Sequence, residues 1–346
     1  MKRHKHLWGK IVTFDNLSTA AREAMLGKRG KSAAARFFTS WEKDVVVLER
    51  ELQEGTYLPG AYHYFYIHDP KTRQVAAAPF RDRVVHHALV RVLEPLFERR
   101  FIEDSFACRK GKGTHAGMRR ALQLAKRYRY ALKCDIRRYF PSIDQGLLTG
   151  MISRVVGDQE ALGLVDLILR THVDRIDRVW PLGASLFDAT EKRLGLPIGN
   201  LTSQFFANIY LDRFDHFVKQ DLRVKGYLRY VDDFLLFSDD RAELKQLGRQ
   251  CAAHLAEISL EIHPDKYRLL PTDNGVDFCG YVVCGDGRIK VRSSSVRRFQ
   301  KRYLALCGQL ERGRLDATEL TRSVKAWIAH AEHAQSWGLR RDVLRA

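Results

Sequence analysis

The sequence has few cysteines and none of the patterns by which cysteines staple a fold or bind zinc. Its 346 residues include six cysteines, scattered along the chain with no CxxC pair: Cys108, Cys134, Cys251, Cys279, Cys284 and Cys307. A chain of this length buries a sizeable core, and has room for two or three subdomains, without such links. The sequence therefore predicts neither a disulfide framework nor a zinc site, which fits a reducing cytoplasm.

Long apolar runs are also missing. No stretch approaches the roughly 18 consecutive apolar residues of a membrane-spanning helix. The basic N-terminus lacks the apolar core of a signal peptide, and no stretch has the pattern of an amphipathic membrane anchor. We therefore expect a cytoplasmic protein with no membrane partner.

Negative charge is scarce in three parts of this chain, whose formal net charge is +18. Residues 1–36 hold nine Lys/Arg against two Asp/Glu, residues 99–138 thirteen against three, and residues 288–346 fourteen against five. Clustered positive charge is typical of proteins that bind a polyanion. An anionic membrane is the alternative, but without an anchor segment nucleic acid is the better interpretation.

Two adjacent aspartates, Asp232 and Asp233, stand in segment 226–238, where apolar and aromatic residues crowd both sides of the pair. Such a segment predicts two short strands with the acidic pair at the turn between them. A solvated turn explains one Asp well, since Asp is common in turns. Two neighbouring carboxylates repel each other, and protonation or a divalent cation relieves the repulsion. The pair therefore predicts a bound cation and a further carboxylate elsewhere.

Asp135 is a candidate for that further carboxylate, because it stands at the end of a short apolar run and before a break marked by Pro141. With Asp232 and Asp233 on a different strand, it completes the carboxylate set of two-metal phosphoryl transfer. In that chemistry two ions roughly 3.5–4 Å apart stabilise the attacking and leaving oxygens. Mg²⁺ prefers a few carboxylates together with substrate phosphates. We therefore expect two Mg²⁺ ions.

A basic turn interrupted by glycines contains Arg109, Lys110 and Lys112, and precedes a helix predicted over residues 116–128. Backbone amides at a helix start, together with nearby Lys or Arg, form phosphate sites. The spacing is not that of a Walker loop. We interpret this turn as a contact to the template backbone or to a triphosphate.

The order of these segments resembles that of reverse transcriptases. Asp135, Leu196–Gly199, Tyr230–Asp233 and Phe278–Tyr281 follow one another as they do in that family, and the resemblance runs from about residue 67 to residue 283. Segment 196–204, Leu-Pro-Ile-Gly-Asn-Leu-Thr-Ser-Gln, is similar to the diversity-generating retroelement branch. That branch has an aliphatic residue where most relatives have Gln, and Ser-Gln where most have Ser-Pro.

The resemblance implies an RNA-templated DNA polymerase that makes error-prone cDNA from a template RNA and dNTPs. It also implies a small, basic, helical accessory protein as a partner. Asp135, Asp232 and the backbone of Ile136 would hold the ions, with Asp233 in support. The dNTP-binding positions would be Lys71, Arg73, Phe140, Ile198, Gly199, Gln204 and Lys266.

Three of these positions have ordinary alternatives. Phe140, five residues after Asp135, would exclude a 2′-hydroxyl in relatives, whereas composition alone favours a core Phe. Lys266 would lie near the leaving pyrophosphate as a possible general acid, or is a solvated turn residue. Lys71 would lie near the triphosphate, or is an exposed strand residue. The pair His86-His87 has no acidic partner at helical spacing and is expected to be structural or solvated.

The expected fold is α/β (α+β): a right-hand polymerase with fingers, an antiparallel palm sheet and a helical thumb. We expect a basic N-terminal arm and helices over residues 1–60, fingers interleaved with the palm over 61–130, the palm over 131–287 and the thumb over 288–346. Residues 1–32 are expected to be an arm that contacts nucleic acid, or a solvated tail. No RNase H or endonuclease domain is expected after the thumb. The thumb would hold duplex phosphates through Arg297, Arg298, Lys301 and Arg302.

Individual elements are also predicted. Helices are expected over 147–170, 204–219 and 243–258, a single strand over 278–283, and a turn at Trp180–Gly183 in a segment that is otherwise hard to interpret. The alternative functions are a retron, abortive-infection or group II intron-type reverse transcriptase, and a non-catalytic RNA-binding module on a palm scaffold. The pattern at Ile198 and Gln204 argues against the first three, and the complete set of carboxylates argues against the last.

Overall fold

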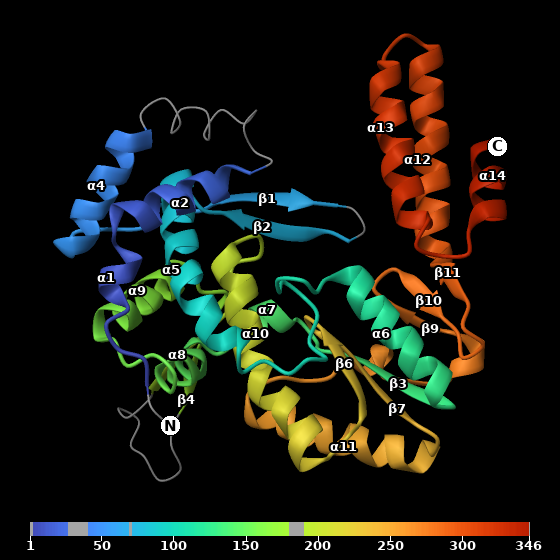
Figure 1. The fold of residues 1–346 in the computed structure, drawn as a ribbon, viewed down its shortest axis with the longest axis horizontal. Helices are drawn as coiled ribbons and strands as arrows, with labels where there is room; N and C mark the ends of the chain where they lie inside the picture. Colours follow the sequence, from blue (N-terminus) through green and yellow to red (C-terminus); the bar gives the residue numbers. More distant parts are fainter. Residues whose placement is uncertain (1–2, 27–40, 69–70, 180–189, 346) are drawn as a thin grey trace. The chain divides into compact units, whose positions relative to one another are not determined.

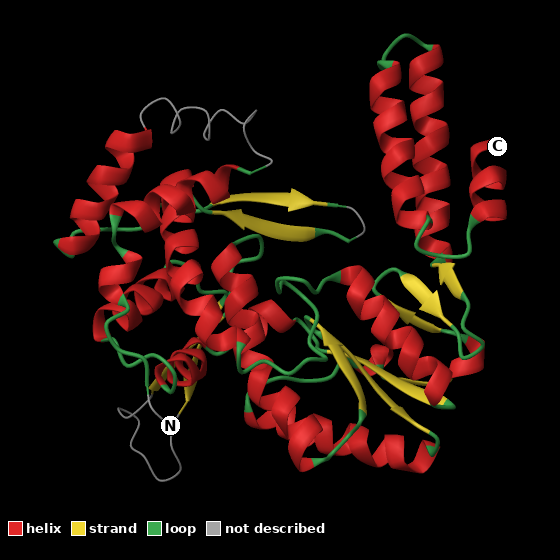
Figure 2. Ribbon diagram, viewed as in Figure 1, coloured by secondary structure: helices red, strands yellow, loops and turns green. Residues whose placement is uncertain are grey.

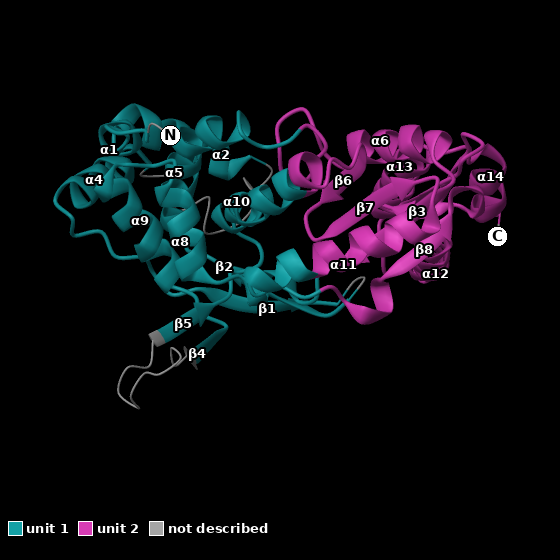
Figure 3. Cartoon of the chain, turned by 90° about the horizontal axis from the view of Figure 1, so that it is seen from below, with its two compact units in different colours: residues 1–102, 136–217, 253–261 teal, residues 103–135, 218–252, 262–346 magenta. Residues whose placement is uncertain are grey.

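The computed structural model describes residues 3–26, 41–68, 71–179 and 190–345 (Figure 1). The chain divides into two compact units, each built from separate stretches of sequence (Figure 3). Unit 1 contains residues 1–102, 136–217 and 253–261, and unit 2 contains residues 103–135, 218–252 and 262–346. Helices and antiparallel strands occur in both units (Figure 2), so the predicted α/β class is confirmed.

Unit 1 is mainly helical. Its helices are α1 (Trp8–Ile11), α2 (Phe14–Met25), α4 (Trp41–Gln53), α5 (Phe80–Glu98), α7 (Tyr139–Ser142), α8 (Gln145–Ser153), α9 (Gln159–Arg170) and α10 (Leu201–His216). Both α2 and α10 pack against α5. The rings of Phe97 on α5 and Phe205 on α10 meet edge to face at 5.6 Å. Helix α10, predicted to begin at residue 204, begins at Leu201 instead. It is followed by a π-helical turn, Phe217–Asp221.

The N-terminal segment corrects the prediction of an arm or solvated tail. Among its described residues, α2 buries Leu17, Ala20 and Ala24 completely or almost completely, and the side chain of Asn16 donates a hydrogen bond to the carbonyl oxygen of Ala88 on α5 at 3.0 Å. Small residues at helical spacing let two helices approach closely, so this apolar stripe outweighs the basic residues that suggested an arm.

The helix predicted over 147–170 is two helices, α8 and α9, with a break between Ser153 and Gln159. Asp158 causes the break, because its carboxylate accepts hydrogen bonds from the backbone of Ala161 at 3.1 Å and of Leu7 at 2.7 Å. It thus caps α9 and ties it to the N-terminal segment. Leu147, an apolar residue of α8, is 39% exposed.

Unit 1 also contains two antiparallel hairpins, β1 (His63–Ile67) with β2 (Arg73–Ala77), and β4 (Arg175–Val179) with β5 (Thr190–Leu194). All five residues of β1 are exposed. The predicted turn at Trp180–Gly183 lies outside the described residues.

Unit 2 is built on an antiparallel sheet with the strand order β6-β7-β3-β8. Its strands are β3 (Tyr130–Asp135), β6 (Gly226–Tyr230), β7 (Asp233–Ser238) and β8 (Arg268–Pro271). Helix α6 (Thr114–Arg127) covers one face, and the part of α11 (Arg241–Glu257) that belongs to unit 2 covers the other (Figure 1). The core under α6 contains Phe106, Met118, Ala121, Leu124, Leu228, Leu235, Phe237, Phe278 and Tyr281.

The single strand predicted over 278–283 is instead two strands of a smaller sheet. β9 (Val276–Phe278) reverses into β10 (Tyr281–Val283), which also pairs with β11 (Ile289–Val291). Cys279 and Gly280, with φ of 51° and 87°, form the turn. Two positive φ values in a two-residue loop suit a tight hairpin, and glycine adopts them without strain.

The C-terminal part of unit 2 is helical, as predicted, with α12 (Ser293–Glu311), α13 (Ala317–Ala331) and an additional helix, α14 (Trp337–Arg345). Phe299 and Trp327 stack at 4.3 Å and join α12 to α13. Short 3-10 helices occur at Pro264–Lys266 and Thr272–Asn274. Among the described helices, none is long and apolar enough to cross a membrane.

Candidate active site

The three predicted aspartates lie at one end of the unit 2 sheet. Asp135 ends β3 and is directly opposite Asp233, the first residue of the antiparallel neighbour β7. Asp232 precedes it in the two-residue turn that joins β6 to β7, which closes on the pair Tyr230 and Asp233. The predicted hairpin is therefore confirmed. The pairing of β7 with β3 brings the acidic pair next to Asp135.

The turn itself is strained. Val231, its first residue, has a φ of 56°. A two-residue hairpin loop needs a positive φ at this position and usually has Gly, Asn or Asp there. For a β-branched residue this backbone conformation is an outlier, of the kind that costs about 1–3 kcal/mol. The strain is located immediately before Asp232.

Negative charge accumulates at this end of the sheet. Burial raises the pKa of Asp233 to about 6; the charges of Asp232 and Asp135 and a hydrogen bond with Asp135 act in the same direction, whereas Lys133 opposes them. Asp135 is 8% exposed and forms an ion pair with Lys266. The site therefore attracts cations.

These residues suit a metal ion that is shared with a substrate. Among the described residues, no three His, Cys, Asp or Glu side chains form a metal cluster by themselves. Mg²⁺, however, is commonly held by one or two carboxylates, waters and substrate phosphates rather than by a complete protein cage. The ammonium group of Lys266 on Asp135 marks a position where positive charge is already accepted. The donor set therefore fits Mg²⁺ bound together with a nucleotide.

Several predicted dNTP-binding residues lie together in unit 1. The carbonyl oxygen of Ile198 accepts a hydrogen bond from Ala76 N at 3.0 Å, and Asn200 Nδ2 donates to Ala76 O at 2.9 Å. These bonds hold the 198–200 loop against β2, the strand that begins at Arg73. Gly199 has a φ of 110°, and a Cβ there would lie 2.6 Å from Val75 Cγ1, so only glycine fits.

The remaining predicted positions in unit 1 are Lys71, Arg73, Gln204, Ile136 and Phe140. Lys71, Arg73 and Gln204 are exposed, with Gln204 in the first turn of α10, whereas Ile136 is buried. Phe140 is half-buried on α7. Its carbonyl oxygen accepts a hydrogen bond from Leu196 N at 3.0 Å, which links α7 to the segment that leads into the 198–200 loop.

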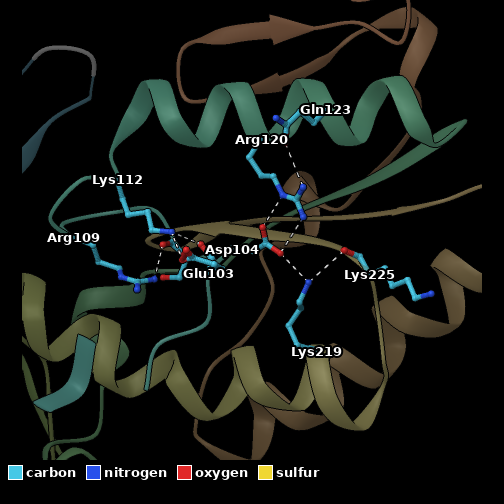
Figure 4. Close-up of polar contacts among 9 residues, drawn as sticks. Glu103, Asp104, Arg109, Lys112, Arg120, Gln123, Lys219 and Lys225 are labelled. Carbon is cyan, nitrogen blue, oxygen red and sulfur yellow. Dashed lines mark hydrogen bonds and ion pairs between the residues drawn. The ribbon is translucent and has the colours of Figure 1, made fainter. Parts of the chain in front are cut away.

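The predicted nucleic-acid contacts lie on the basic turn before α6 and on α12. Lys112 pairs with the carboxylate of Glu103, and Arg109 donates to the carbonyl oxygen of Ser105 at 2.8 Å, so both hold their own loop (Figure 4). Lys110 is exposed. The basic residues of α12 are also exposed: Arg297, Arg298, Lys301 and Arg302.

Sequence reasoning gave no role to two basic residues that the structure brings close to the aspartates. The positive charge of Lys133 acts to lower the pKa of Asp233, against the effect of burial. Its ammonium group donates a hydrogen bond to the carbonyl oxygen of Asp277 at 2.8 Å. Arg229, two residues before the turn, is fully buried. The sequence did contain a signal for Arg229, namely a charged residue between Leu228 and Tyr230 in a strand that is otherwise apolar.

Comparisons with known proteins found one matching family model and several distant relatives. The family model described as "Reverse transcriptase (RNA-dependent DNA polymerase)" matches residues 68–283. Protein YkfC of Escherichia coli (strain K12) is 24% identical over 279 residues, which are 69% of this chain and 70% of YkfC. Group II intron-encoded protein LtrA of Lactococcus lactis subsp. cremoris is 25% identical over 52% of this chain, and Nuclear intron maturase 1, mitochondrial, of Arabidopsis thaliana is 32% identical over 28% of it.

The chain spans 29% of the length of LtrA and 14% of that maturase. Among solved structures, telomerase from Candida albicans aligns over 71% of this chain and 50% of its own, with 15% identity and a TM-score of 0.45. Apo telomerase from Candida tropicalis aligns over 68% and 49%, with 12% identity and a TM-score of 0.49. The family model, which covers more than half of the sequence, shows that this chain belongs to the reverse transcriptases, which are RNA-directed DNA polymerases with a right-hand polymerase fold.

Proposed function

We propose that this reverse transcriptase catalyses nucleotide addition at Asp135, Asp232 and Asp233. The observation that carries the proposal is the β3–β7 register, in which Asp135 is opposite Asp233 and Asp232 occupies the adjoining turn. In the reaction the primer 3′-hydroxyl attacks the α-phosphate of a dNTP in line. Catalysis of this kind depends mostly on positioning and electrostatics, which fixed carboxylates at a strand end supply.

Asp135, Asp232 and the backbone carbonyl of Ile136 would hold two Mg²⁺ ions, with Asp233 in support. Bound there, the ions would stabilise the charge that develops on the attacking and leaving oxygens. Lys266 would hold positive charge near the leaving pyrophosphate and serve as its general acid.

The substrate side of the proposal uses the other predicted residues. Arg73 and Lys71 would bind the triphosphate, and the ring of Phe140 would exclude a ribose 2′-hydroxyl. Ile198, Gly199 and Gln204 would lie along the nascent base pair. Lys110 and the basic face of α12 would bind nucleic-acid phosphates, in line with the division into fingers, palm and thumb.

The experiment that tests the catalytic assignment is primer extension on poly(rA)/oligo(dT) with Mg²⁺. Asp232→Asn keeps the size of the side chain and removes its charge, so it should abolish nucleotide addition while RNA affinity and thermal unfolding remain those of the wild type. The matched control is Asp342→Asn on α14, whose carboxylate side chain is 67% exposed; it should extend the primer normally. Polymerisation by Asp232→Asn at the wild-type rate would refute the assignment.

The proposed biological role is the synthesis of error-prone cDNA from a template RNA in a diversity-generating retroelement. Segment 196–204 supports this role through its aliphatic Ile198 and its Ser203-Gln204 pair. The six cysteines are free thiols, which suits a cytoplasmic enzyme. The same resemblance supports a small basic accessory protein as a partner; co-purification of the two chains from cells that express both would test this.

A group II intron-type reverse transcriptase is the second candidate, and the similarity to LtrA and to an intron maturase favours it. Sequencing of the cDNA separates the two roles. A retroelement enzyme of the proposed kind should accumulate errors chiefly opposite template adenine, as the family resemblance implies. An intron-type enzyme should copy adenine as faithfully as the other bases.

A further inference from the structure

A fully buried arginine adjoins the turn that carries Asp232. Arg229 on β6 is 0% exposed. Its two terminal nitrogens donate to different acceptors, Nη1 to the carbonyl oxygen of Val231 at 2.9 Å and Nη2 to Ser105 Oγ at 3.2 Å. Burying a guanidinium is unfavourable unless its donors are used, so these bonds are part of what keeps Arg229 inside.

The bond to Val231 acts on the strained part of the turn. The carbonyl oxygen of Val231 belongs to the peptide group that leads into Asp232, and the orientation of that group sets the direction of the Asp232 Cα–Cβ bond. Val231 has a φ of 56°, a conformation that persists in a β-branched residue only where the surroundings impose it. A charge-assisted hydrogen bond at this carbonyl is such a constraint.

The other side of the guanidinium is anchored as well. The segment that contains Ser105 pairs with the edge of β6: Arg229 N donates to Asp104 O at 2.9 Å, and Phe106 N donates to Arg229 O at 3.0 Å. The buried carboxylate of Asp104 is held by Arg120 at 2.7 Å and by Lys219 at 2.8 Å (Figure 4). Ser105 is thus held in place by the contacts of its neighbours Asp104 and Phe106. Its hydroxyl oxygen, which accepts the hydrogen bond from Arg229 Nη2, in turn holds the guanidinium.

We propose that Arg229 is a positioning residue of the polymerase: it holds the Val231–Asp232 peptide group so that the Asp232 carboxylate is directed for metal binding. This inference rests on the proposed role of Asp232 as a metal ligand. It differs from a role for Arg229 in core packing alone, because it predicts coupling to the conformation of Val231.

The test combines Arg229→Met, which keeps most of the bulk, with Val231→Gly, which accepts a positive φ without strain. Arg229→Met should lower kcat for primer extension by about tenfold or more and leave the KM for dNTP within about twofold. In the Val231→Gly enzyme, Arg229→Met should lower kcat by a several-fold smaller factor, because glycine adopts the positive φ without the hydrogen bond from Arg229. If the fold-loss in kcat of the double variant equals the product of the losses of the two single variants, Arg229 and Val231 are not coupled and the proposal is overturned.

Two readouts do not depend on turnover. Mn²⁺ binding to the enzyme with primer and template, followed by electron paramagnetic resonance, should weaken severalfold in Arg229→Met. Hydrogen–deuterium exchange should accelerate in the peptide that contains residues 226–238. Wild-type Mn²⁺ affinity together with wild-type exchange would overturn the proposal.

Two further variants keep the test decisive if Arg229→Met does not fold. Ser105→Ala removes one bond of the guanidinium and leaves the bond to Val231, so it should reduce kcat less than Arg229→Lys, whose single ammonium group does not reproduce the guanidinium fork. The reverse order would overturn the proposal.

If Asp232→Asn is active, the proposed function itself fails. If Asp232→Asn is inactive while Arg229→Met has normal kcat and Mn²⁺ affinity, only the role of Arg229 fails.

Discussion

Lys266 forms an ion pair with Asp135 although 131 residues separate them along the chain. Asp135 ends β3, and Lys266 ends a 3-10 helix whose preceding residue, His263, donates its backbone N–H to Asp135 O at 2.8 Å. The two backbone segments are thus joined by a hydrogen bond as well as by the side chains. A lysine fixed beside a carboxylate at the end of a sheet has a defined position from which to act on a substrate.

Lys266→Met should reduce the single-turnover rate of nucleotide addition by about 10²–10⁴-fold, the usual effect of removing a general acid. Lys266→Arg keeps the charge but not the proton donor, because a guanidinium does not release its proton. It should therefore remain well below the wild type. Lys245→Met on the exposed face of α11 is the control and should be unaffected. A rate for Lys266→Met within about twofold of the wild type would remove Lys266 from the mechanism.

Gly199→Ala should destabilise the protein by about 1–3 kcal/mol, because it combines a positive φ with a contact of 2.6 Å to Val75 Cγ1. Adding Val75→Ala should restore part of the loss, since it removes the contact and leaves the φ penalty. The control is Gly163→Ala on α9, where a Cβ meets nothing within 4 Å. That change should be neutral or stabilising by about 0.4–1 kcal/mol. Urea unfolding measures all three, and equal losses for Gly199→Ala and Gly163→Ala would contradict the prediction.

The sequence predicted features that depend on local chemistry. The apolar flanks of Asp232 and Asp233 predicted two strands and a turn, which the structure contains. Helix α4 was predictable in the same way, because Val45, Leu48 and Leu52 recur on one face, and all three are buried. Such patterns need no knowledge of distant residues. That Asp135 lies directly opposite Asp233 is a pairing between strands distant in the sequence, and it was not predicted.

The predictions were wrong or incomplete where a local sequence pattern is compatible with two structures, or where a residue distant in the sequence determines the structure. Segment 278–283 is apolar enough for one strand, but Cys279 and Gly280 adopt positive φ and reverse it. Asp158 interrupts a helical pattern because it also binds the backbone of Leu7, 151 residues away. The role proposed for Arg229 depends on Ser105, 124 residues away. No periodicity within the segment contains that information.

The stability of unit 1 should fall in mild acid because of His86. Burial lowers the pKa of His86 on α5 to about 3, with His87 and Arg83 acting in the same direction. In the unfolded chain His86 binds a proton near pH 6.5, whereas in the folded protein it stays neutral down to about pH 3. The free energy of unfolding is therefore highest above pH 6.5 and decreases as the pH falls toward 3. At about pH 5 the loss is about 2 kcal/mol.

Urea unfolding at about pH 7.5 and about pH 5 would measure this loss. His86→Leu should show a smaller difference between the two conditions, because it removes the group that the unfolded chain protonates. His68→Leu, at an exposed position, is the control and should keep the difference of the wild type. An equal pH dependence in all three proteins would show that other groups cause the acid sensitivity.

The last prediction concerns copying accuracy and Ile198. The carbonyl oxygen of Ile198 is bonded to Ala76 N, so a substitution changes the side chain while the backbone of the loop stays anchored. Most relatives have Gln at this position, according to the resemblance, and a Gln side chain can hydrogen-bond the sugar and minor-groove edge of a forming base pair. Isoleucine has neither donor nor acceptor.

One such hydrogen bond contributes about 0.5–1.5 kcal/mol. Since about 1.4 kcal/mol corresponds to a tenfold change in rate, a single side chain changes discrimination by severalfold to about tenfold. Ile198→Gln should therefore lower misincorporation opposite template adenine severalfold and leave correct incorporation nearly unchanged. Ile198→Val, which stays apolar, is the matched control and should keep the wild-type error spectrum. Sequencing cDNA made by the three enzymes on one template measures the effect, and identical spectra for Gln and Ile would exclude Ile198 as a determinant of fidelity.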